Sequence, residues 1–82
     1  EINRLIGKCR QSQNPIDGLE NLFRTKEDGM VAFAVGQEYA RKGKANLSLQ
    51  WFAKAEKLLP LLKWKIKARE EQRKMRRILE KD

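Results

Sequence analysis

Histidine is absent from this 82-residue chain, and cysteine occurs once, at Cys9. Without histidine the chain has no imidazole to bind a metal ion and no Ser-His or Cys-His nucleophile pair. A single cysteine excludes an internal disulfide, so we expect a reducing compartment inside the cell, with the cytoplasm ahead of the nucleus. The chain begins at Glu1 rather than Met and opens without a signal peptide. These features predict one module of a larger intracellular protein.

Long apolar runs and the usual catalytic patterns are missing as well. No apolar run approaches the roughly 18 residues that a membrane-spanning helix needs. Gly29, Gly36 and Gly43 stand at a helical spacing, unlike the glycines of a phosphate-binding loop. Acidic residues are scattered without the pairing of a general acid and base, at Glu20, Glu27, Asp28, Glu38 and Glu56. The sequence therefore predicts no enzyme activity, no metal or cofactor and no small-molecule substrate.

The apolar residues that are present predict a folded, all-helical domain. Leu, Ile, Val and Phe account for 20 of 82 residues, above the roughly one-fifth below which charged chains stay disordered. Strand-like alternation of apolar and polar residues is nearly absent, and the apolar spacing is helical. Helices are predicted at about 2–12, 15–24, 29–42, 45–59 and 61–82. We expect a single domain over 1–82, with flanking helices in 1–28, an antiparallel hairpin in 29–60 and a long C-terminal helix in 61–82.

Capping and breaking residues mark the predicted helix ends. Asn14 before Pro15 predicts a helix start with a side-chain cap, since proline has no amide hydrogen to leave unpaired. Thr25 or Asp28 is expected to cap the next helix, and Gly43 to end it. A short turn at Gly43 would then fold the helices on either side of it into the hairpin.

Two helical faces are predicted to meet inside this hairpin. One face of its first helix carries Ala32, Val35, Gly36 and Tyr39. One face of its second helix carries Ser48, Phe52 and Ala55. Small residues such as Gly36 and Ala55 allow the two backbones to approach, and the larger Phe52 fills the space beside them.

The hairpin resembles a tetratricopeptide repeat (TPR), whose pattern runs W-x2-L-G-x2-Y, then A-x3-F, then P. Matching intervals are held by Val35, Gly36, Tyr39, Phe52, Ala55 and Pro60. Ala32 stands where the family often has Trp, and Ser48 stands where it has a small Ala. The resemblance covers residues 29–62, with Leu61 onward in the place of a following helix.

This resemblance implies a protein-interaction role, with a peptide held on the concave face that the first helix of each pair lines. The exposed polar residues of that helix are then the binding candidates: Gln37, Glu38 and Arg41. One repeat cannot bury its own faces, so helices on both sides are expected to cover the hairpin. A weaker resemblance is to the three-helix MIT domains, which bind short helical motifs in membrane-trafficking proteins. The placement of Gly36 and Pro60 favours the TPR interpretation.

Positive charge is concentrated in the last quarter of the chain. The whole chain has 19 Lys and Arg against 11 Asp and Glu, a formal net charge of +8. Residues 63–82 hold nine Lys and Arg against four acids, or net +5. Such a helix attracts acidic protein surfaces and can follow a phosphate backbone. The candidate binding residues on it are Arg69, Arg73, Lys74, Arg76 and Arg77.

Several interpretations of this basic helix stay open. It can be a solvated face, because Glu70 and Glu71 are spaced to pair with Lys74. It can bind an acidic protein, or a second copy of the chain through Met75, Ile78 and Leu79. It can also bind nucleic acid, with Trp64 either stacking on a base or packing on the hairpin. The apolar stripe beyond Ala68 is too thin to anchor the helix on a membrane.

The sequence thus predicts a small helical bundle built on a TPR-like antiparallel hairpin, with flanking helices and a long C-terminal helix. Its predicted function is that of a non-catalytic protein–protein interaction module. The alternative function is that of a nucleic-acid-binding accessory module that uses the basic C-terminal helix.

Overall fold

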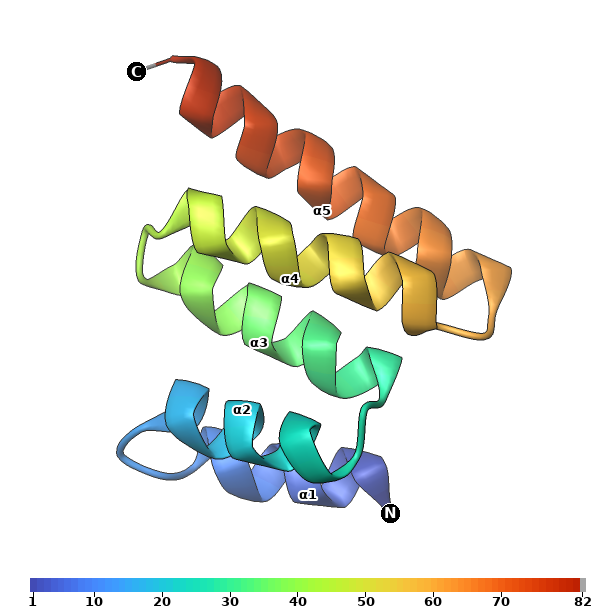
Figure 1. Cartoon of the computed structure of the whole chain (residues 1–82). Helices are drawn as coiled ribbons and strands as arrows, with labels where there is room; N and C mark the ends of the chain where they lie inside the picture. The colour runs from blue at the N-terminus through green and yellow to red at the C-terminus, as the bar shows by residue number, and fades with distance from the viewer. Residues whose placement is uncertain (82) are drawn as a thin grey trace.

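The computed structural model describes residues 1–81 as α-helices joined by short turns, with no β-strand in that range. The helices are α1 (Ile2–Arg10), α2 (Pro15–Thr25), α3 (Gly29–Arg41), α4 (Ala45–Leu58) and α5 (Leu62–Glu80). They form one stack, with α3 and α4 between the α1–α2 pair and α5 (Figure 1). The all-α prediction is confirmed, and each helix begins and ends within about two residues of the predicted position.

The helix ends follow the predicted signals at two of three positions. The Asp28 side chain accepts a hydrogen bond from the Met30 amide at 2.8 Å and so caps α3. Gly43, with φ of +75°, provides the left-handed residue that ends this segment. The predicted side-chain cap by Asn14 is wrong, although Asn14 does occupy the N-cap position of α2. Its backbone, at φ −123° and ψ 76°, is not in the conformation that aims a side chain at the first helical amides.

Close contact between α3 and α4 forms the centre of the stack. A Cβ atom added to Gly36 would lie 2.9 Å from the Phe52 ring, so only glycine leaves room for that ring. A Cβ atom on Gly29 would lie 2.7 Å from the backbone nitrogen of Leu59. The buried Ser48 hydroxyl donates a 2.7 Å hydrogen bond to the Gly36 carbonyl. The predicted meeting of the two small-residue faces is therefore confirmed.

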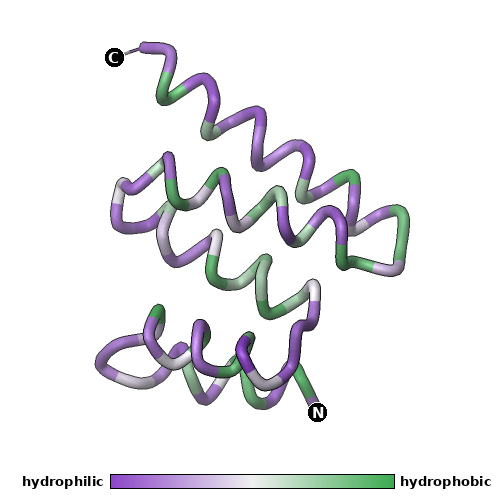
Figure 2. Tube along the Cα trace, in the orientation of Figure 1, coloured by the Kyte–Doolittle hydropathy of each residue, from purple (hydrophilic) through white to green (hydrophobic). Residues whose placement is uncertain are grey.

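Helix α3 packs on both sides and separates two apolar clusters. On the side of α1 and α2 it buries Val31 and Val35 against Ile6 and Leu19. On the side of α4 and α5 it contributes Ala32 and Phe33 to the second cluster. The hydropathy trace agrees with this, because the first turns of α3 are mostly apolar whereas most of α5 is hydrophilic (Figure 2). The flanking helices thus cover the hairpin on both sides, as predicted.

Helix α5 covers α4 with one narrow stripe and then extends beyond it. Its buried residues are Ala68, Gln72 and Met75, and every described residue after Met75 is exposed. Since α5 has 19 residues and α4 has 14, its last turns lie beyond the shorter helix. The predicted projection of the C-terminal end past the hairpin is confirmed.

We predict that Gly36→Ala destabilises the chain by about 1–2 kcal/mol. Overpacking against Phe52 costs about 1–3 kcal/mol, and the better helix propensity of alanine returns up to about 1 kcal/mol. The matched control is Gly7→Ala on α1, because a Cβ atom at Gly7 meets nothing within 4 Å. That change should stabilise the chain by up to about 1 kcal/mol. Urea denaturation measures both, and equal effects of the two substitutions would contradict the close helix contact.

Candidate interaction groove and basic helix

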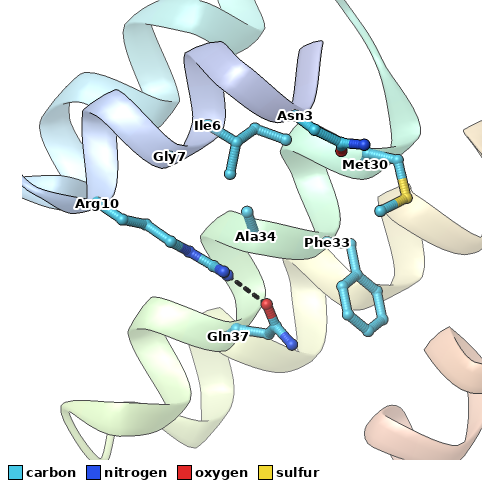
Figure 3. Close-up of a pocket in the computed structure, with 8 residues that line it drawn as sticks. All are labelled: Asn3, Ile6, Gly7, Arg10, Met30, Phe33, Ala34 and Gln37. Carbon is cyan, nitrogen blue, oxygen red and sulfur yellow. Dashed lines mark hydrogen bonds between the residues drawn. The ribbon is translucent and has the colours of Figure 1, made fainter. Parts of the chain in front are cut away.

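A groove runs along one face of the stack where α1, α3 and the start of α5 meet. Its first section encloses about 190 Å³ between α1 and α3 (Figure 3), and its lining residues are Asn3, Ile6, Gly7, Arg10, Met30, Phe33, Ala34 and Gln37. A second section shares Asn3 and Met30 and continues to Leu59, Pro60, Leu61 and Trp64. These residues are called the groove below. Its floor is apolar and its polar groups lie on α1 and at Gln37.

Aromatic packing joins α5 to the floor of the groove. The rings of Phe33 and Trp64 meet edge-to-face, with centroids 6.0 Å apart. Phe33 is nearly fully buried, while Trp64 keeps part of its surface exposed. Lys63 and Lys67 stand beside Trp64 in a further shallow hollow. The predicted packing of Trp64 on the hairpin is therefore confirmed, and its exposed part borders the groove.

The polar candidates on α3 divide between the groove and an internal ion cluster. Gln37 lines the groove, and its Oε1 accepts a hydrogen bond from the Arg10 guanidinium (Figure 3). Glu38 was predicted to be exposed, and this is wrong, because the residue is 7% exposed. Its Oε2 lies 3.3 Å from Arg10 Nε and 3.2 Å from an Arg41 guanidinium nitrogen, without hydrogen-bond geometry. Glu38 therefore serves to hold α1 against α3, and Arg41 is an exposed member of the same ion cluster.

The five cationic candidates on α5 fall into two groups. Arg69 and Lys74 form ion pairs within the chain, Arg69 with Glu56 at 2.8 Å and Lys74 with Glu71 at 3.1 Å. Arg73, Arg76 and Arg77 are exposed and form no ion pair with any residue in 1–81. The predicted pairing of Lys74 with Glu71 is confirmed, whereas Glu70 makes no such contact. Only the group of three keeps its charge available to a partner.

The apolar candidates for self-association are also divided. Met75 is 7% exposed and packs in the α3–α4–α5 cluster, so it cannot contribute to an outer surface. Its inclusion in the predicted self-association surface was wrong, because α4 already covers this position. Ile78 and Leu79 are 49% and 39% exposed and lie near the C-terminal end of α5.

Glu56 on α4 fixes the position of α5 through three contacts. Its carboxylate accepts hydrogen bonds from Arg69 at 2.8 Å and from Gln72 at 2.7 Å. Its backbone carbonyl accepts a hydrogen bond from Lys65 at 2.8 Å. The hydrogen bond from Arg69, then that from Gln72, lowers the pKa of Glu56 below its ordinary value, and this effect exceeds the opposing effect of burial.

A second polar contact attaches α2 to α3. The Tyr39 hydroxyl donates a 2.7 Å hydrogen bond to Glu20 Oε2. This hydrogen bond to a carboxylate, followed by burial, raises the pKa of Tyr39 to about 12. Tyr39 thus remains protonated at neutral pH and acts as a structural donor on the side of α3 that faces away from the groove.

Sequence patterns indicated only part of the groove. Gln37 was identified, but Asn3, Arg10, Met30, Phe33 and Trp64 were not assigned to one surface. Met30, Phe33 and Gln37 are spaced three and four residues apart, so the sequence alone places them on one face of α3. No sequence signal places them beside Asn3 and Arg10, because that proximity depends on how α1 docks.

The described residues lack two features that would assign a function directly. Within residues 1–81, no group of His, Cys, Asp and Glu side chains is arranged to hold a metal ion. Over the same residues, no helix combines the length and the hydrophobicity needed to cross a bilayer. Comparison with known proteins found no matching family model, no similar curated protein and no similar solved structure. The groove and the basic helix are therefore the features from which a function can be argued.

We predict that Glu56→Gln destabilises the chain by about 1 kcal/mol at pH 7, because the charged hydrogen bond to Arg69 is lost. The effect is no larger because solvent screens the exposed side of this contact. The pKa of Glu56 is lower in the folded state than its ordinary 4.5, so its stabilising effect is full above that pH. The effect is lost as the pH falls through the lower, folded-state pKa. The stability difference between the parent chain and the variant should therefore shrink below about pH 4.5.

Chemical denaturation at several pH values between about 3 and 7 measures this difference. Glu70→Gln is the control, because Glu70 is an exposed acid of α5 with no ion pair in residues 1–81. It should change stability little at any pH. A pH-independent effect of Glu56→Gln would show that packing, not charge, accounts for its contribution.

Proposed function

We propose that this chain is a non-catalytic protein-interaction module, similar in its mode of action to a TPR hairpin, and that the groove holds a segment of a partner protein. The observation that carries this proposal is an open apolar floor, formed by Met30, Phe33 and Trp64, at the meeting point of three helices. Apolar anchors buried in such pockets supply most of the energy of peptide recognition.

Each section of the groove, about 190 Å³ for the first and about 200 Å³ for the second, is smaller than a typical small-molecule pocket. Pockets that bury drug-sized ligands usually occupy roughly 300–1,000 Å³. The section between α1 and α3 encloses about 190 Å³, which suits one apolar side chain of a peptide. The second section continues the same surface and offers room for a neighbouring residue of that peptide.

Polar groups at the groove can orient the bound segment. The Asn3 side chain and Gln37 Nε2 make no hydrogen bond with any residue in 1–81, so both can bond a peptide backbone. Lys63 beside Trp64 places positive charge at one end of the groove, whereas the charge of Arg10 at the other end is offset by its ion pair with Glu38. A segment with an apolar anchor and an acidic residue on the Trp64 side is the partner that best matches this distribution.

The lining of the groove also argues against catalysis at this surface. It contains no carboxylate, thiol, imidazole or hydroxyl side chain. Such groups are the usual nucleophiles and proton-transfer agents of enzymes. Binding is the activity that this set of side chains supports.

The proposal predicts that peptides selected from a phage-displayed random library bind the chain in the groove. Met30→Glu should lower the affinity of a selected peptide by at least about tenfold, since it places a charge on the apolar floor. Gly7→Phe should do the same by filling the first section, where a new Cβ atom meets nothing within 4 Å. Fluorescence anisotropy measures the affinity, and circular dichroism confirms that each variant is folded.

Leu47→Glu is the matched control for these two variants. Leu47 is 36% exposed on α4, and no residue of α4 lines either section of the groove. This variant should bind the selected peptide with unchanged affinity. The proposal is rejected if no peptide is enriched, or if both groove variants bind as well as the parent chain.

A further inference from the structure

Five exposed cations lie on the side of the stack away from the α4–α5 turn. The α3–α4 turn and the C-terminal end of α5 lie on the same side, opposite the α4–α5 turn (Figure 1). The turn carries the exposed Lys42 and Lys44, and α5 carries Arg73, Arg76 and Arg77. None of these five forms an ion pair with a residue in 1–81. They are called the cationic edge below.

The three arginines of the cationic edge share one outward face of α5. At about 100° per residue, Arg73, Arg76 and Arg77 fall within about 100° of arc, with Arg73 and Arg77 on the side away from the buried Ala68 and Met75 and Arg76 on its flank. The exposed Leu62 and Ile66 share this arc but lie in the first two turns of α5, beside the α4–α5 turn. Leu79 lies on the packed side of the helix and Ile78 on the opposite flank. The three arginines, called the arginine face below, therefore have positive charge and no apolar side chain among them.

Helix dipoles do not account for this charge. Three helices end and two begin at this side of the stack, since successive helices alternate in direction (Figure 1). With about −0.5 charge at each C-terminus and +0.5 at each N-terminus, the dipoles sum to only about −0.5. The five unpaired cations carry far more positive charge than is needed to offset this dipole charge. Nearby acids reduce the excess but do not remove it; these are Asp17 beside the turn, and Glu70 and Glu80 on α5.

We infer that the cationic edge binds the phosphate backbone of nucleic acid without reading its sequence. A protein partner normally needs an apolar centre within its interface, and the arginine face has none. A second copy of the chain would place these arginines against one another. A phosphate backbone requires only closely spaced cations, and arginine donates to phosphate through two parallel hydrogen bonds. The inference uses residues outside the groove, so it stands or falls separately from the peptide-binding proposal.

Counterion release makes the inference quantitative. The logarithm of the binding constant falls with the logarithm of salt concentration, with a slope of about −0.9 per neutralised phosphate on duplex DNA. Five contacts give a slope of about −4.5, which corresponds to about a 500-fold loss of affinity between 50 and 200 mM salt. Removing the three arginines should change the slope to about −1.8, or about a 12-fold loss over the same range.

The experiment measures anisotropy of labelled duplexes of about 20 base pairs, in DNA and RNA forms, between 25 and 200 mM salt. The DNA form of such a duplex is about 68 Å long, so it exceeds the 36 Å longest dimension of the protein and does not truncate the site. The test variant is Arg73→Gln combined with Arg76→Gln and Arg77→Gln. The parent chain should bind either duplex, and the logarithm of its binding constant should fall steeply with the logarithm of salt concentration. In this variant the slope should be smaller in magnitude by about 2.7.

The matched control is Arg24→Gln combined with Lys26→Gln and Lys57→Gln. These three residues are exposed, form no ion pair with a residue in 1–81, and lie at the opposite side of the stack, where α2 and α4 end. Both triple variants lose three positive charges, so the control reports the effect of net charge alone. The control variant should show the same salt dependence of binding as the parent chain.

Three results would overturn the inference. The first is no binding of either duplex at 25 mM salt. The second is an equal loss of slope in both triple variants, which would assign binding to net charge rather than to the cationic edge. The third is binding of poly-glutamate as tightly as of the duplexes, which would indicate an acidic protein partner. Circular dichroism of each variant excludes unfolding as the cause of a lost interaction.

Discussion

The close approach of α3 and α4 at Gly29 and Gly36 is the constraint on which the rest of the structure depends. Without a side chain at Gly36, the Phe52 ring lies directly against the α3 backbone and is fully buried there. Burial of such a side chain is worth about 1.5–3 kcal/mol, which is a large share of the stability of a domain this small. The Ser48 hydroxyl bonds to the Gly36 carbonyl at the same place and so fixes the rotation of one helix against the other.

This fixed rotation of α3 determines what each of its other faces can do. With Gly36 turned toward α4, Val31 and Val35 face the α1–α2 pair and are fully buried. Met30 and Gln37 are then left on the remaining face, where α1 and the start of α5 form the walls of the groove. Because α3 has only one face that is not covered by a neighbour, the position of the groove is a consequence of the helix packing.

Local spacing explains which features could be predicted from the sequence. The contact of Gly36 with Phe52 was predictable, because each of them lies on a helical face whose other residues are small or apolar. The environment of Glu38 was not, because Arg10 lies 28 positions earlier and reaches it only when α1 docks on α3. Burial of Met75 was missed for a similar reason: the apolar stripe of α5 marks one face, but not how far α4 covers it.

The basic helix shows why net charge alone describes an electrostatic surface poorly. Arg69 is held by Glu56 and Lys74 by Glu71, so these cations contribute to the fold and add little to the external field. Arg73 lies one turn beyond Arg69 on the same side of the helix, but no acid pairs with it among residues 1–81. Sequence composition counts all three residues equally. Their difference arises from the orientation of α5 on α4, which Glu56 and Gln72 set together. The packing of the core therefore also decides which charges remain available for binding.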